Sequence, residues 1–485
     1  MKAHRRSTLT ILLVLILASF GHNASAYSLL THEQLIDLAW DGSIAPLLLS
    51  RYPNLTPTDL DRARAYAYGG CVIQDIGYYP FGDASFSNLT HYVRTGDFIV
   101  NLFRNAQNAN ELAFAVGALS HYIGDSEGHP LATNVAVPIE FPSLGAKYGK
   151  EVNYAQGRHQ HVQTEFAFDI NDIAHHRLAP IRYLRHIGLE VSVRQLRMAF
   201  YQTYGLYEDF SGKRGRRINV RAYRFAVRTF IPRIAYAVTL LHRKHEPPDP
   251  DTPEFAEMQT EIAAIAAENH WDQYRRRAGI GTWMLAGLLY VLPKVGPFSL
   301  VAIKGPTVAT EADYIHSVSL SNSALRHMLA RFTPPSSRRP IVVNGAAINA
   351  TQEHALNEPP PTHVLPGNPA VNNETRQERL DPHHPLPNRD LDTGRVVQPG
   401  GYPLTDSTYA DLLHVLTSQP DQPVPPGIKE DIQAYYANLD LPITTKRDPQ
   451  KWARVLADLK ILVNMPTSEE PIPFPTYEDT AEPAE

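Results

Sequence analysis

The sequence predicts an all-α protein in which helical units are joined by proline-rich segments. Three observations support this fold class. Apolar residues recur at helical spacing in 32–40, 189–204 and 220–242. The stretch 111–122 is apolar nearly all round, as expected of a helix buried at the centre of a bundle. Helical patterning returns in 406–466, which predicts a helical C-terminal extension.

The composition of the 485-residue chain is that of an ordinary folded protein, with 43% apolar and 20% charged residues. The single cysteine, Cys71, excludes a disulfide within this chain and any cysteine-based zinc cluster. A metal site would therefore use nitrogen and oxygen ligands, for which the chain offers 21 histidines. The formal net charge of −5 argues against a general polyanion-binding surface.

Residues 1–26 have the pattern of a secretory signal. They combine a basic start, an apolar stretch over 9–20 and a small-residue cleavage site at 24–26. The apolar stretch is too short for a helix that spans a bilayer, although an uncleaved anchor helix is the alternative. We therefore expect a secreted or periplasmic protein whose mature chain begins at Tyr27.

The rest of the chain divides where prolines accumulate. A proline-rich break at 243–254 ends the first helical unit, and prolines crowd the stretch 331–400, as in a linker. The predicted units are a catalytic domain at 27–245, a helical extension at 246–330, a proline-rich linker at 331–400, a small helical region at 401–466 and a disordered acidic tail at 467–485.

The segment 283–303 is unusually apolar for a globular protein. Prolines separate its two halves, 283–292 and 298–303, and neither half is long enough to cross a bilayer. Two interpretations stay open. The segment is either a buried helix packed against the first domain or an interfacial hairpin that dips into lipid, which would give the protein a peripheral membrane contact.

Histidines and carboxylates gather in the first third of the chain. His121, Asp125 and His129 follow one another at intervals of four residues, so on a helix they share one face. His161 and Glu165 repeat this spacing. Imidazole and carboxylate ligands without thiolate are typical of catalytic zinc. A core hydrogen-bond network is the alternative, since such groups must be paired or coordinated when they are buried.

The order of these residues resembles the zinc-dependent bacterial phospholipase C family, whose superfamily includes the S1/P1 nucleases. The run Leu-Ser-His-Tyr-Ile-Gly-Asp at 119–125, followed by Pro130 and Asn134, looks like the core motif of that family. The resemblance implies an all-helical domain that holds three zinc ions. It also implies nine ligands, which in chain order are Tyr27, His32, Asp75, His91, His121, Asp125, His129, His161 and Glu165.

The same resemblance distributes these ligands over three ions. It implies that Asp125 bridges a zinc pair and that Tyr27 binds through its own amine and carbonyl, so that cleavage of the signal creates a ligand. The implied sets are Asp75, His91, His121 and Asp125 for the first ion, Tyr27, His32 and Asp125 for the second, and His129, His161 and Glu165 for the third.

The third set departs from the family pattern. The family's histidine normally comes six residues after the aspartate of the core motif, where this chain has Leu131. His129 lies two residues earlier, and His159 is the alternative ligand.

The resemblance implies phosphodiester hydrolysis by a zinc-activated water, which Asp75 would orient or deprotonate. A bridged zinc pair lowers the pKa of bound water to about 7. We expect phospholipids as the substrate class. One alternative is an S1/P1-type single-strand nuclease, favoured by the position of His32 five residues after Tyr27, in which case nucleic acid is the partner. The other is a non-catalytic zinc-binding surface protein.

Specificity for choline headgroups is not supported. The family places aromatic residues at two positions of the headgroup site, where this chain has Ile76 and Asn88. Tyr78, Tyr79, Phe81 and Phe86 lie near these positions in the sequence. They form either a rearranged wall of the site or ordinary packing contacts.

Overall fold

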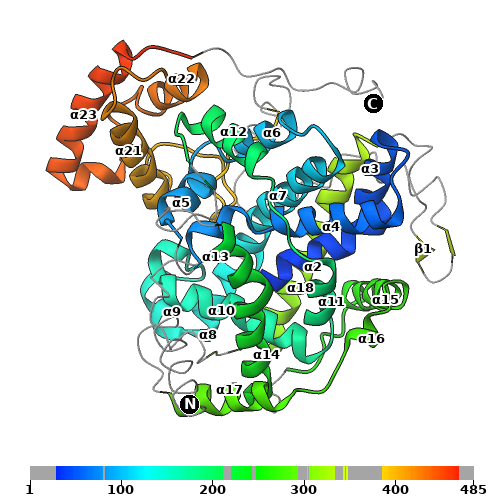
Figure 1. Ribbon diagram of the computed structural model, residues 1–485. Coiled ribbons are helices and arrows are strands. Elements are labelled where there is room, and N and C mark those ends of the chain that lie inside the picture. The colour runs from blue at the N-terminus through cyan, green and yellow to red at the C-terminus, as the bar shows by residue number, and fades with distance from the viewer. Residues whose placement is uncertain are drawn as a thin grey trace, which may run out of the picture.

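The computed structural model is built almost entirely of helices (Figure 1), which confirms the predicted all-α class. The predicted signal segment 1–26 and Tyr27 lie outside the residues that the structure describes. The described residues are 29–79, 82–208, 210, 220–242, 247–292, 303, 305–333, 342–343, 346–347 and 385–468. Within them, the only strand pair is formed by two residues on each side, β1 (Val342–Val343) and β2 (Ala346–Ala347).

The helices of the first unit alternate with short π- and 3-10 turns. In chain order they are α2 (Leu29–Ala39), η1 (Trp40–Ile44), α3 (Ala45–Arg51), α4 (Pro57–Gly70), η2 (Gln74–Gly77), α5 (Ala84–Tyr92), α6 (Thr95–Arg104), α7 (Ala109–Gly128), η3 (His129–Thr133), α8 (Asn134–Glu140), α9 (Pro142–Tyr148), α10 (Tyr154–Ala174), α11 (Ile181–Ile187), α12 (Val193–Tyr204), α13 (Val220–Phe225), η4 (Ala226–Phe230) and α14 (Ile231–His242).

The remaining elements follow the break at 243–254. They are α15 (Pro253–Glu268), α16 (Trp271–Tyr274), α17 (Ile280–Val291), α18 (Val308–Ala330), α21 (Pro403–Thr417), α22 (Pro426–Tyr435), η7 (Thr444–Arg447) and α23 (Pro449–Asn464).

Helix α7 lies at the centre of the molecule (Figure 1). Its apolar side chains, among them Phe114 and Val116, are fully buried, as the all-round apolar pattern predicts. Helices α2, α4, α6 and α18 pack against it. Because α18 comes from the predicted extension 246–330, the extension shares the core of the first unit. The domain limits themselves stay predictions.

Helices α4 and α7 approach each other backbone to backbone. A Cβ atom at Gly117 would lie 2.2 Å from the carbonyl oxygen of Ala67, and one at Gly70 would lie 2.1 Å from that of Phe114. Only glycine fits at these two positions without a shift of the helices. The close packing brings the end of α4, with the carbonyl of Cys71, against the middle of α7.

Helices α21–α23 form a small unit at one end of the molecule, at the upper left of Figure 1. The residues before them, 385–402, are here called the strap. The strap is packed against the first unit: the Thr95 hydroxyl donates to the Arg389 carbonyl (2.8 Å) and accepts from the Arg389 N–H (2.9 Å). The prediction of a linker over 331–400 is therefore corrected for its last sixteen residues, 385–400, whereas residues 348–384 lie outside the described structure.

Helix α17 packs on α14 through one side only, at the bottom of Figure 1. Ala286 and Leu289 are buried, whereas Trp283, Met284 and Tyr290 are 54%, 67% and 73% exposed. The interpretation as a buried helix thus holds for one face of α17. In the described part of the chain, no helix is both long and apolar enough to cross a membrane.

Candidate metal centre

Eight of the nine predicted ligands come together in the interior of the first unit. They are carried by α2, η2, α5, α7 with its continuation η3, and α10. All eight are buried, with at most 3% of each residue exposed. They form three groups, Asp75–His91–His121, His32–His121–Asp125 and His129–His161–Glu165, of which the first two share His121. The ninth, Tyr27, lies outside the described residues.

Asp125 lies between the first two groups and turns one carboxylate oxygen to each. Its Oδ1 is 3.3 Å from His32 Nε2. Its Oδ2 is 3.1 Å from His121 Nε2 and 3.4 Å from His91 Nε2. A carboxylate whose two oxygens face two separate sets of ligand atoms has the geometry of a bridge between two metal ions.

The separations between ligand atoms fit tetrahedral zinc. With Zn–N and Zn–O bonds of about 2.0–2.1 Å, neighbouring ligand atoms lie about 3.3 Å apart. The Nε2 atoms of His91 and His121 are 3.4 Å apart. Asp75 Oδ1 is 3.3 Å from His91 Nε2 and 3.9 Å from His121 Nε2. The Asp75–His91–His121 group therefore has room for one ion between its members.

The third group is formed by the end of α7 and by α10. His161 Nε2 and Glu165 Oε1 are 2.8 Å apart, and His129 Nε2 is 3.6 Å from the same oxygen. His159, the alternative ligand, is half-buried and belongs to none of the three groups. The structure thus brings His129, and not His159, together with His161 and Glu165.

Three of the histidines are aimed by backbone carbonyls. A carbonyl oxygen only accepts a hydrogen bond, so the Nδ1 atom that contacts it must carry the proton and Nε2 is left with its lone pair. In a metal site this second contact fixes the ring and its tautomer. The pairs are His91 with Ser87 (2.7 Å), His121 with Cys71 (2.9 Å) and His129 with Leu391 (2.7 Å).

Burial and neighbouring charges shift the pKa values of several predicted ligands. Burial lowers the pKa of His91, but its contacts with Asp125 and Asp75 outweigh burial and raise this pKa to about 10. Burial raises the pKa of Glu165 well above its usual range, and Asp125 and Asp75 add to the effect. Burial lowers the pKa of His161 well below its usual value, and the nearby His129 lowers it further. Burial therefore disfavours the ionised form of Glu165, and a bound cation would offset this effect.

Several ligand atoms make no hydrogen bond at all. Both carboxylate oxygens of Asp125, Nε2 of His129 and Oε1 of Glu165 are buried and unpaired. Buried polar atoms of proteins nearly always have a hydrogen-bond partner. A closed hydrogen-bond network, the alternative interpretation of this cluster, would satisfy these atoms. Metal ions would satisfy them too, and the separations between the ligand atoms fit tetrahedral zinc.

Of the described aromatic residues near the headgroup positions, only Tyr78 lies against a predicted ligand, and Phe81 lies outside the described residues. Its ring centre is 5.3 Å from that of His91. Tyr79 stacks on Tyr223, and Phe86 stacks on Phe200 in the core. Packing therefore accounts for Tyr79 and Phe86.

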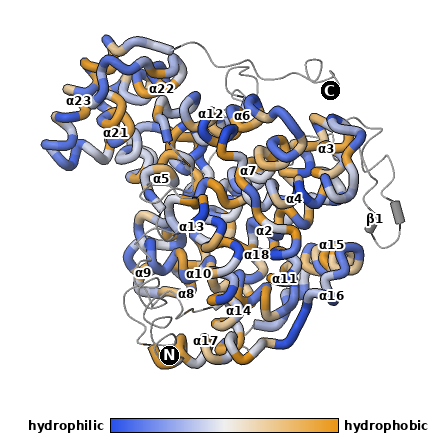
Figure 2. Tube along the Cα trace, in the orientation of Figure 1, coloured by the Kyte–Doolittle hydropathy of each residue, from blue (hydrophilic) through white to orange (hydrophobic). Residues whose placement is uncertain are grey.

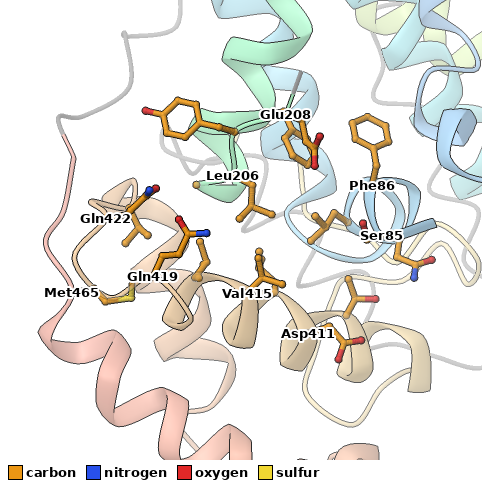
Figure 3. A pocket seen from close by; sticks show the side chains of 18 residues that line it. Ser85, Phe86, Leu206, Glu208, Asp411, Val415, Gln419, Gln422 and Met465 are labelled. Atoms are coloured by element: carbon orange, nitrogen blue, oxygen red, sulfur yellow. The ribbon is translucent and has the colours of Figure 1, made fainter. Parts of the chain in front are cut away.

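A cavity of about 400 Å³ lies one layer away from the centre, between α5, the end of α12 and α21 (Figure 3). Phe86, Leu89, Leu206 and Val415 are among its lining residues, and none of the eight ligands lines it. The cavity is therefore separate from the metal centre, although α5 contributes to both.

A comparison with protein families identifies the first unit. Residues 31–211 match the model of a family described as zinc dependent phospholipase C. The chain carries a zinc-dependent phospholipase C domain. The match includes all eight described ligands and covers less than half of the chain. No curated protein and no solved structure matches the chain.

Sequence reasoning did not find the contribution of the strap to this domain. The carbonyl of Leu391 orients His129, and Asp392 Oδ1 lies 3.5 Å from the same imidazole nitrogen. No motif marked these residues, because they lie within the stretch predicted as a linker.

Substitution of Asp125 by asparagine should remove the two ions that share this residue. An amide has one oxygen, and its NH₂ group is a donor that cannot bind a cation. Zinc per chain, measured by inductively coupled plasma mass spectrometry, should fall while the third ion is retained. The matched control is Asp172→Asn, a buried carboxylate that pairs with Arg177 (2.9 Å) and belongs to none of the three groups. Wild-type zinc content in Asp125→Asn would contradict the bridge.

Proposed function

We propose that the chain is a zinc-dependent phosphoric diester hydrolase that cleaves phospholipids in the manner of a phospholipase C. The position of Asp125 carries this proposal, because each of its oxygens faces a different group of buried ligands within a zinc-dependent phospholipase C domain. Carboxylate-bridged metal pairs are typical of enzymes that hydrolyse phosphate esters.

The three groups of ligands differ in the number of ligand atoms that each offers to an ion. Asp75, His91, His121 and one oxygen of Asp125 offer four ligands, which is a complete tetrahedral set. The third group offers three ligands and so leaves a position open for water or substrate, as in catalytic sites. When bound, zinc supplies a hydroxide at neutral pH and positive charge for the phosphate oxygens.

The side chains around the ions hold protons and exclude water. Asp75, a member of the Asp75–His91–His121 group, would accept the proton that the attacking water gives up. The Nδ1–H groups of His91 and His121 stay hydrogen-bonded to backbone carbonyls, so these rings keep one tautomer throughout the reaction. Complete burial of the ligands lowers the local dielectric and strengthens every charge interaction in the centre.

The proposed activity is tested with vesicles of mixed phospholipids and the zinc-loaded protein. Phosphorylated headgroup should be released, a chelator should abolish the release and added zinc should restore it. Asp125→Asn should lower the rate by more than about a hundredfold, the upper end of what changes outside the ligand shell cost, whereas Asp172→Asn should stay active. No release from a protein that carries zinc would contradict the phospholipase proposal. Cleavage of single-stranded DNA by the same sample would favour the nuclease alternative instead.

We further propose that the protein is secreted or periplasmic and that cleavage before Tyr27 supplies a ligand of the second ion. The first described residues support the proposed N-terminal ligand. Leu29 and Leu30 are buried, and the N–H groups of Leu30 and Thr31 both donate to the carboxylate of Asp169 (3.0 and 3.1 Å). Asp169 lies four residues after Glu165 on α10. The chain therefore enters the described structure in the interior, two residues after Tyr27.

A protein with one alanine added before Tyr27 should lose the second ion and its activity, because the α-amine is displaced from the centre. The extended and mature proteins are prepared from the same fusion by proteolytic cleavage, and their N-termini are verified by mass spectrometry. Equal zinc content and activity of the two forms would refute the N-terminal ligand.

Contact with a lipid surface is proposed for α17. Its outward face carries Ile280, Trp283, Met284 and Tyr290, and the exposed Arg276 and Arg277 directly precede it. In Figure 2 this helix is a hydrophobic segment that follows a hydrophilic one. Exposed apolar side chains beside basic ones are typical of segments that bind the surface of anionic membranes.

Replacement of both Trp283 and Met284 by alanine should weaken binding to anionic vesicles at least about tenfold, since each large apolar side chain contributes about 1.5–3 kcal/mol when it is buried. Co-sedimentation with vesicles measures this affinity. The matched control is Tyr207→Ala, which removes a 69% exposed aromatic side chain from another surface. Hydrolysis of a water-soluble short-chain phospholipid should be unchanged in both variants. Unaltered vesicle binding by the double variant would exclude α17 as the contact.

A further inference from the structure

His129 receives its orienting contact from a distant part of the chain. The carbonyls that aim His91 and His121 belong to Ser87 and Cys71, in the helical elements that surround the centre. The carbonyl that aims His129 belongs to Leu391, 262 residues later. The histidine that departs from the family spacing is thus the one whose partner comes from the strap.

The strap contacts two of the ligand groups through one residue. The N–H of Leu391 donates to the carbonyl of His91 (3.0 Å), and the carbonyl of Leu391 accepts from Nδ1 of His129 (2.7 Å). Leu391 therefore joins a ligand of the first group to a ligand of the third group. Its side chain is fully buried, so this contact lies inside the protein.

Asp392 fastens the strap on the elements that carry the ligands. Its Oδ2 accepts hydrogen bonds from the hydroxyls of Tyr92 (3.0 Å) and Tyr402 (2.5 Å). Its carbonyl accepts from the side-chain amide of Asn134 (2.8 Å). The Tyr402 hydroxyl in turn accepts from the N–H of Ala155 (3.1 Å), in the first turn of the helix that carries the other two ligands of the third group. Asp392 thereby links α5, α8 and α10.

The strap also fits the end of α7 closely. Gly394 has φ +66°, a backbone conformation that favours glycine, and a Cβ atom there would lie 2.3 Å from the carbonyl oxygen of Ser126. Ser126 directly follows the bridging Asp125. Within the strap, the Asp390 carboxylate accepts from the N–H groups of Asp392 and Thr393, which fixes the turn before it meets the centre.

We propose that the strap is a component of the metal centre, in which Leu391 and Asp392 position His129 and thereby set the affinity of the third ion. The inference rests on the proposed zinc-dependent function. Without the strap, Nδ1 of His129 would be a buried donor with no partner, and the ring would be free to turn its Nε2 away from Glu165. Groups that orient a metal-binding histidine typically change metal affinity 10- to 100-fold.

The test uses two conservative variants of the full chain, Tyr402→Phe and Asp392→Asn. Each zinc-loaded protein is equilibrated with a series of zinc buffers of decreasing free zinc, and the zinc retained per chain is measured. One ion of the three should be bound about 10- to 100-fold more weakly in both variants, while the other two ions keep their wild-type affinity. A merely structural loss would weaken all ions together with the fold.

The matched control is Tyr409→Phe, which removes another buried tyrosine–aspartate hydrogen bond, to Asp431 (2.9 Å), from the same C-terminal region. This variant should keep all three affinities. The inference is overturned if Tyr402→Phe and Asp392→Asn keep wild-type affinities, if they lose every ion in parallel, or if the wild-type chain binds only two ions. A wild-type chain that binds zinc but cleaves no phosphodiester would refute the proposed function and leave this zinc-binding test intact.

Discussion

The structure depends on the burial of eight ionisable side chains at one place. Their carboxylates and imidazoles have lost their hydration, and burial alone disfavours the ionised form of Glu165 and the protonated form of His161. A cluster of this kind is stable only if cations take the place of the water. The fold around it therefore supplies both the ligand atoms and the contacts that keep each ring turned inward.

Helix geometry accounts for much of this arrangement. Helical periodicity places His121 and Asp125 on one face of α7. The glycines between α4 and α7 allow an approach close enough for a carbonyl of one helix to orient a histidine of the other. Beyond Asp125 the helix widens into the π-helical turn η3, which begins at His129. Such π-helical turns are frequent at functional sites, and this one presents His129 to α10.

Local patterns made the all-α class and the pairs within α7 and α10 predictable, because periodicity and spacing act over a few residues. The inclusion of His32, Asp75 and His91 depended on the family resemblance, since spacing alone says nothing about contacts between distant helices. The strap was not predictable. Its contribution at Leu391 is a backbone carbonyl, a group that every residue possesses, and it ends the proline-rich stretch 331–400, whose composition is typical of a linker. The sequence also did not predict whether α17 is buried or exposed, because an apolar sequence is compatible with both.

The position of the strap in the chain has a consequence for how the protein is made. A chain is synthesised from its N-terminus onward. His129, His161 and Glu165 therefore emerge well before the segment that closes over them, and the linkage through Leu391 forms only when most of the chain has been completed. On the proposed arrangement, an unfinished or truncated chain lacks a fully assembled centre. The proposed hydrolytic activity would then appear only after the strap has been synthesised.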